Sequence, residues 1–141
     1  MPTRKATATW EGNLKNGKGA FKGESGIVAG PYGFASRFES GPGSNPEELL
    51  AAAEAACFSM ALSLGLEQAG APPARIDTEA ACTIDRVGEG FKITKIHLSV
   101  RARVPNIDAA KFEQIARKTK ETCPVSVALK AVDIELDARL A

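Results

Sequence analysis

One long apolar stretch, residues 43–65, constrains this chain more than any other feature. Asn45 is a suitable N-cap and Pro46 suits the first helical position, so we expect a helix to begin there. Beyond the two glutamates of the first turn, the run is apolar and is interrupted only by Glu54, Ser59 and Ser63. A helix that is apolar on nearly every side is expected to be buried, and this one is too short and too interrupted to predict a membrane span.

Length, charge and cysteine content limit the class of protein. The chain has 141 residues, and we expect residues 1–141 to form a single domain with its own core. A net charge of +1 gives no indication of a nucleic-acid or membrane partner. The N-terminus has no apolar leader, and three cysteines without a leader favour a reducing compartment. We therefore expect a cytoplasmic protein.

The pattern of apolar residues predicts an α+β fold with a mostly antiparallel sheet. The predicted strands are residues 6–11, 19–24, 34–39, 76–87, 91–104 and 132–138, and the predicted helices are residues 46–70, 109–122 and 124–130. Asn16-Gly17 predicts a two-residue hairpin turn, and residues 30–33 predict another turn. Strands grouped before helices are typical of antiparallel α+β folds. Residues 91–104 alternate between apolar and charged side chains, which predicts one buried and one wet face.

The cysteines carry most of the chemistry that the sequence offers. There is no Cys-x-x-Cys pair, no pair of histidines and no glycine-rich phosphate loop, so we expect neither a metal nor a cofactor. Cys82 shares the apolar face of a predicted strand, which favours a packed, inert thiol. His97 alternates with charged residues, which favours a solvated face.

Cys57 and Cys123 each allow two interpretations. Pro124 suits the first position of a helix, so Cys123 would be an N-cap whose thiol the helix dipole could make more acidic. It could equally be a cap that happens to be cysteine. Cys57 lies in the middle of the apolar helix, where a thiol is either packed and inert or made reactive by a nearby cation. The pattern leaves both questions open.

Four motifs resemble those of the osmotically inducible protein C (OsmC) family. They are SNPEEL at 44–49, AACFSMALS at 55–63, FKITKI at 91–96, and CPVS at 123–126 followed by LKA at 129–131. The resemblance extends over nearly the whole chain in the same order. The organic hydroperoxide resistance proteins are related to this family and share its cysteine pair.

The resemblance implies a thiol peroxidase that reduces organic hydroperoxides, and hydrogen peroxide less well, in oxidative and osmotic stress. Cys57 matches the peroxidatic cysteine, and Cys123 matches the resolving cysteine that forms a disulfide with it. Arg37 matches the arginine that stabilises the thiolate, and Glu47 matches the glutamate that holds that arginine. The family also implies a dihydrolipoyl group or lipoylated protein as reductant, and a sheet wrapped around a long central helix in an intertwined homodimer.

Helical spacing adds a constraint on this site. Glu47 and Cys57 are ten residues apart, or roughly 15 Å along one helix, so one arginine is not expected to reach both. If they share a site, Glu47 would come from a second subunit. Two alternatives remain: a redox sensor whose disulfide alters a partner, and a non-catalytic module that binds a small hydrophobic ligand.

Overall fold

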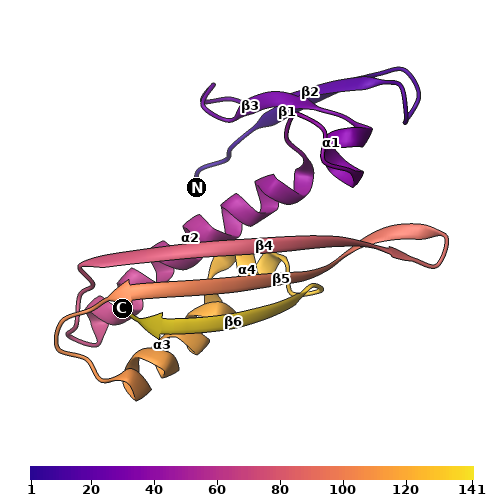
Figure 1. Ribbon diagram of the computed structural model, residues 1–141. Coiled ribbons are helices and arrows are strands. Elements are labelled where there is room, and N and C mark those ends of the chain that lie inside the picture. The colour runs from indigo at the N-terminus through magenta and orange to yellow at the C-terminus, as the bar shows by residue number, and fades with distance from the viewer. The chain divides into compact units, whose positions relative to one another are not determined.

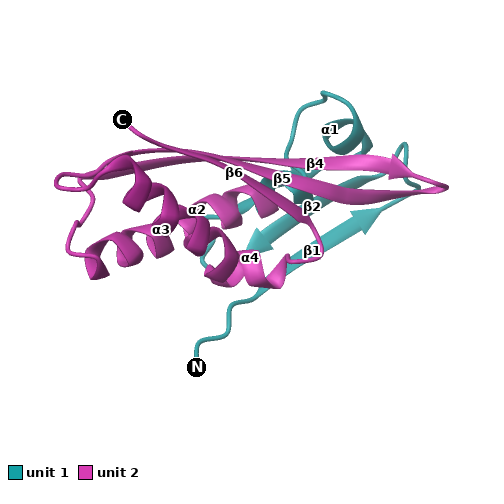
Figure 2. Cartoon of the chain, turned by 90° about the horizontal axis from the view of Figure 1, so that it is seen from below, with its two compact units in different colours: residues 1–49 teal, residues 50–141 magenta.

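The computed structural model describes residues 1–141 and divides into two compact units, residues 1–49 and 50–141 (Figure 2). It combines helices with two separate three-stranded sheets, which confirms the predicted α+β class.

The first unit is a small antiparallel sheet followed by one short helix. Its strands are β1 (Ala6–Glu11), β2 (Lys18–Gly23) and β3 (Ala29–Tyr32), paired in that order, and its helix is α1 (Phe34–Phe38) (Figure 1). The predictions of β1 and β2 are confirmed. The predicted two-residue turn at Asn16-Gly17 is wrong, because the last strand pair is Glu11 with Lys18. Asn13 instead shapes a longer connection by accepting a hydrogen bond of 2.8 Å from the backbone of Asn16.

Two further predictions in the first unit are wrong. Residues 30–32 belong to β3 and are not a turn, and residues 34–38 form α1 and not a strand. The alternation of Phe34, Ser36 and Phe38 also fits a helical turn, since periodicity over so few residues is ambiguous. The two phenylalanine rings meet across one turn with centroids 5.1 Å apart, and the Ser36 hydroxyl accepts a hydrogen bond from the Gly33 backbone. These local contacts favour the helix.

The second unit contains most of α2 (Pro46–Gln68) and all later elements. These are β4 (Arg75–Val87), β5 (Gly90–Arg103), α3 (Ala109–Thr122), α4 (Pro124–Ala128) and β6 (Asp133–Leu140). β4 and β5 pair antiparallel, as expected, whereas β5 and β6 pair in parallel. The sheet is therefore mixed. Two helices connect β5 to β6, and a crossover of this length lets the chain return in the same direction.

The core of the second unit lies between its sheet and its helices. Figure 2 shows α2, α3 and α4 on the same face of this sheet. The fully buried apolar residues come from α2 (Phe58, Leu62, Leu66), β5 (Ile96, Leu98, Val100, Ala102) and α3 (Phe112, Ala116). The predicted alternation of the long strand β5 is thus confirmed. Gly65 allows α3 to approach α2, because a Cβ there would lie 3.0 Å from a methyl carbon of Ile115.

The prediction that α2 is buried all round is wrong for a single chain. Met60 and Leu64 are 78% and 55% exposed, although Phe58 and Leu62 on the same helix are fully buried. By length and composition α2 could also cross a membrane, a property that apolar core helices share. One chain supplies too few elements to cover every side of this helix.

Candidate active site

Cys57 and Cys123 lie together in the second unit. Their sulfur atoms are 3.0 Å apart, and both residues are thiols. Cys57 lies in α2 and is partly exposed, whereas Cys123 lies between α3 and α4 and is 1% exposed. Two thiols at this distance are close enough for a disulfide to form between them.

Pro124 explains why Cys123 occupies this position. A proline disfavours the helical conformation of the residue before it, and Cys123 has an extended backbone with ψ of 133°. α3 therefore ends at Thr122, and α4 begins at Pro124, as predicted. The Cys123 thiol does not cap α4 by a hydrogen bond but lies against Cys57 instead.

The surroundings of Cys57 disfavour its thiolate. Burial raises the pKa of the Cys57 thiol, and the side-chain hydrogen bond with Cys123 raises it further. The negative charge of Glu54 acts in the same direction, while the backbone of Val125 opposes the shift by donating a hydrogen bond. The groups that set this pKa all belong to the second unit, and none of them is a cation.

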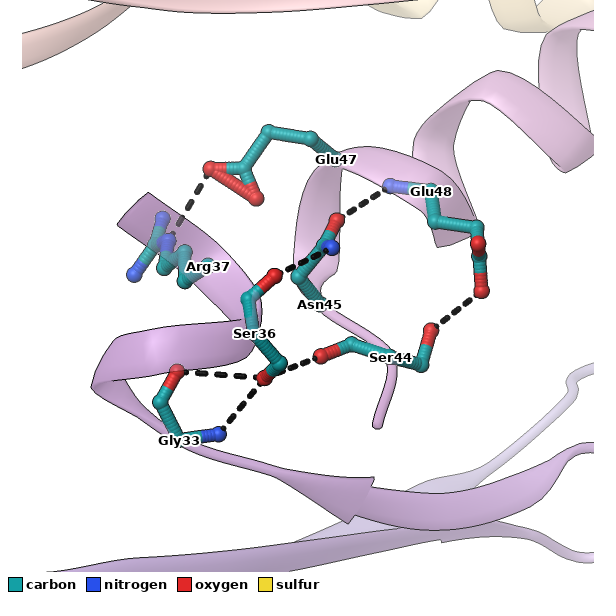
Figure 3. A network of polar contacts seen from close by, with 7 residues as sticks. All are labelled: Gly33, Ser36, Arg37, Ser44, Asn45, Glu47 and Glu48. Carbon is teal, nitrogen blue, oxygen red and sulfur yellow. Dashed lines mark hydrogen bonds and ion pairs between the residues drawn. The ribbon is translucent and has the colours of Figure 1, made fainter. Parts of the chain in front are cut away.

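Arg37 and Glu47 lie together in the first unit. Arg37 Nε donates to Glu47 Oε1 at 2.9 Å (Figure 3). Glu47 is 6% exposed, whereas the Arg37 side chain is 36% exposed. Arg37 comes from α1, not from a strand as predicted, and Glu47 from the first turn of α2. Because this ion pair uses Nε, the two terminal nitrogens of the guanidinium remain for another acceptor. The predicted pairing of these two residues is present within one chain.

A polar network fixes the start of α2 next to this ion pair (Figure 3). Asn45 accepts a hydrogen bond of 2.8 Å from the Glu48 backbone, which confirms it as the N-cap. The Asn45 amide also donates to the backbone oxygen of Ser36 at 2.9 Å, and the Ser36 hydroxyl donates to the backbone oxygen of Ser44 at 2.7 Å. These hydrogen bonds hold α1 against the first turn of α2, and they thereby fix the backbone positions of Arg37 and Glu47.

A cavity of about 260 Å³ opens beside Arg37 in the first unit. Apart from Arg37 and the backbone of Gly33, its lining is aromatic or aliphatic: Trp10, Leu14, Tyr32, Phe34 and Phe38. Trp10 and Tyr32 pack with ring centroids 5.5 Å apart. A mostly apolar cavity with one cation suits a molecule with an organic tail and a polar end.

A second contact near the two cysteines, between α2 and α4, was not predicted from the sequence. Glu54 is fully buried, and its Oε1 accepts a short hydrogen bond from the hydroxyl of Ser126 in α4. Its other oxygen, Oε2, is buried without a hydrogen-bond partner. The available signal was a single acidic residue inside an apolar run, three positions before Cys57.

Cys82 and His97 lie outside these clusters. Cys82 packs partly buried against the core, as predicted. His97 lies on the polar face of β5, where its Nδ1 is 3.2 Å from Glu135 Oε1 in β6. That hydrogen bond lowers the pKa of Glu135, and Lys95 adds to the effect. No group of three or more His, Cys, Asp or Glu residues lies close enough together to hold a metal ion.

The comparisons with known proteins decide the family. The profile of the family described as OsmC-like protein matches residues 39–137. This chain belongs to that family. It is 54% identical to Peroxiredoxin OsmC of Escherichia coli strain K12 over 138 residues, which are 97% of this chain and 96% of that protein. Over 98 residues it is 31% identical to an organic hydroperoxide resistance protein of Xanthomonas axonopodis pv. citri, covering 68% and 67% of the two chains.

Solved structures support the same fold for this OsmC-like chain. The crystal structure of the organic hydroperoxide resistance protein OhrB of Bacillus subtilis matches with a TM-score of 0.74 at 26% identity, covering 95% of this chain and 97% of that one. An OsmC-like protein of unknown function from Vibrio cholerae matches with a TM-score of 0.76 at 13% identity, covering 98% and 99%, and shows likeness of fold alone.

Proposed function

We propose that this protein is a thiol-dependent peroxidase that reduces organic hydroperoxides to alcohols. The observation that carries the proposal is the 3.0 Å contact between the Cys57 and Cys123 sulfur atoms. The names of the similar proteins, a peroxiredoxin and organic hydroperoxide resistance proteins, support the same chemistry. The response to oxidative and osmotic stress is the corresponding role in the cell, and the cytoplasm is its proposed location.

The reaction divides into two steps on the chain. In the first, the Cys57 thiolate attacks the O–O bond; a sulfenic acid forms on Cys57, and the alkoxide takes a proton and leaves as an alcohol. In the second, the Cys123 sulfur attacks Cys57, the S–O bond breaks, and water leaves as the disulfide forms. Cys57 takes the first step because it is the more exposed thiol of the pair.

The first step needs a cation near Cys57, and the ion pair of Arg37 with Glu47 is the proposed source. A guanidinium favours the thiolate and can orient the peroxide, while a carboxylate on its far side fixes its plane. Ten residues of α2, roughly 15 Å of helix, separate Glu47 from Cys57. We therefore assign the Arg37–Glu47 pair of one subunit to the Cys57 of its partner in a homodimer.

Two features support this homodimer and the class of substrate. The exposure of Met60 and Leu64 leaves an apolar side of α2 that a second copy would cover. The apolar cavity beside Arg37 suits the organic part of a hydroperoxide better than it suits hydrogen peroxide. Organic hydroperoxides are accordingly the proposed substrates, with hydrogen peroxide a poorer one.

A dihydrolipoyl group, free or on a lipoylated protein, is the proposed reductant of the disulfide. The test is steady-state consumption of an organic hydroperoxide with dihydrolipoamide, thioredoxin or glutathione as the only reductant. We expect many turnovers with dihydrolipoamide and few with the other two. Consumption of one equivalent per chain, whatever the reductant, would contradict an enzyme and favour a redox sensor. No consumption would favour a hydrophobic ligand-binding module.

A further inference from the structure

Glu54 is a buried carboxylate that has no role in the two reaction steps proposed above. It is fully buried in α2, and Ser126 of α4 satisfies only one of its two oxygens. A buried polar atom without a hydrogen-bond partner lowers the free energy of unfolding. An atom of this kind in a folded protein therefore needs an explanation, such as a catalytic role. No basic residue pairs with Glu54, and an apolar or neutral side chain would avoid the cost.

The position of Glu54 links it to both cysteines. It precedes Cys57 by three residues in α2, and Ser126 follows Cys123 by three residues at the start of α4. Residues three apart in a helix lie on the same face. Glu54 and Cys57 therefore share one face of α2, where Glu54 contacts Ser126 of α4 and Cys57 contacts Cys123, the residue just before α4. The negative charge of Glu54 also acts on the Cys57 sulfur.

The disulfide-forming step requires a proton to move inside this site. Cys123 must lose the proton of its thiol, and the hydroxide that leaves Cys57 must gain one to become water. Cys123 is 1% exposed, so bulk water has little access to its proton. Glu54 is the only Asp, Glu, Lys or Arg residue that is buried within residues 50–141.

We propose that Glu54 carries this proton, with Ser126 holding its carboxylate in place. Oε2 takes the proton from the Cys123 thiol, and the Cys123 sulfur then attacks the sulfur of the Cys57 sulfenic acid. As the S–O bond breaks, Glu54 gives the proton to the leaving hydroxide and is again a carboxylate. No external acid, base or oxidant is consumed. The proposal rests on the peroxidase function and assigns a residue to its second step.

The test compares the two steps in the variant Glu54→Gln. Glutamine keeps the size of the side chain and an oxygen for the Ser126 hydroxyl, but its amide cannot take up the proton of the Cys123 thiol. After one equivalent of an organic hydroperoxide, we expect sulfenic acid on Cys57 to form at least as fast as in the wild type. We expect the disulfide to form about 100-fold more slowly, which is the lower end of the usual contribution of a general base. Glu54→Asp, which keeps a carboxylate, should recover part of that rate.

Two further variants separate proton transfer from structure. Ser126→Ala removes the anchor but keeps the carboxylate, so it should slow the disulfide step less than Glu54→Gln. Ser59→Ala is the matched control, because it removes a 2.8 Å hydrogen bond from α2 to Thr78 in β4. It should leave both steps unchanged. The proposal is overturned if Glu54→Gln forms the disulfide at the wild-type rate, or if Ser126→Ala slows it as much.

A probe without peroxide distinguishes failure of this inference from failure of the proposed function. Dithiobis(nitrobenzoate) reacts with Cys57 to give a mixed disulfide and one thionitrobenzoate. Cys123 then attacks the Cys57 sulfur and releases a second thionitrobenzoate, while the proton of the Cys123 thiol passes to Glu54. A slow second release in Glu54→Gln supports the proton carrier even if the wild type reduces no peroxide. A normal second release in that variant contradicts the carrier even if the wild type is an active peroxidase.

Discussion

The sulfur atoms of Cys57 and Cys123 lie 3.0 Å apart although 66 positions separate the two residues in the chain. α2 supplies one thiol in the middle of an apolar helix, and the break between α3 and α4 supplies the other. Replacing each cysteine in turn tests which of the two thiols reacts first with the peroxide.

The two cysteines should behave differently when replaced. Cys57→Ser should abolish the first step, because a hydroxyl is a far poorer nucleophile than a thiolate. Cys123→Ser should keep that step but prevent the disulfide, so that Cys57 accumulates as sulfenic acid and then sulfinic acid. Mass spectrometry after one equivalent of an organic hydroperoxide measures both. Added oxygen on Cys123 in the Cys57→Ser protein would reverse the assignment.

Removing the Cys123 thiol should make Cys57 more acidic. Burial raises the pKa of Cys57, and the hydrogen bond and charge of Cys123 raise it further. Cys123→Ala removes the last two causes, so the pKa falls and a larger fraction of Cys57 is thiolate at neutral pH. The rate of alkylation of Cys57, followed against pH, should reach its half-maximum at a lower pH in the variant. A midpoint that does not move, or moves upward, would contradict this account of the site.

Arg37→Ala should slow reduction of the hydroperoxide without unfolding the protein. It leaves Glu47 buried without its partner, at a cost of about 1–3 kcal/mol in the free energy of unfolding. Arg37→Ala/Glu47→Gln should restore that stability but not the rate. Urea unfolding and steady-state kinetics measure the two effects separately. If the double variant regains the rate, the arginine acts on stability alone.

A charge on the exposed side of α2 should break the proposed homodimer. Leu64→Glu places a carboxylate on a residue that is 55% exposed in one chain and would be covered in the dimer. Sedimentation at low micromolar concentration should show a dimer for the wild type and a monomer for the variant. Ala110→Glu, at an exposed position in α3 away from Leu64, is the control and should stay dimeric. A folded, active wild-type monomer would refute the shared site.

The sequence alone predicts helix starts and the buried faces of strands, because both depend on residues that are close together in the chain. Asn45 and Pro46 start α2, and Asp108 caps α3 by accepting a 2.7 Å hydrogen bond from the Lys111 backbone. The alternation within β5 predicted which of its residues are buried. Helix caps and strand alternation act over a few residues, so they can be read from the chain directly.

Contacts between distant residues decided the rest. The parallel pairing of β6 with β5 and the buried hydrogen bond between Glu54 and Ser126 join segments that no local pattern connects. Motif resemblance named the two reactive cysteines, but only the packing of α2 against α3 and α4 brought their sulfur atoms into contact. The acidity of Cys57 likewise depends on its burial and on Cys123 and Val125, which are far from it in the sequence.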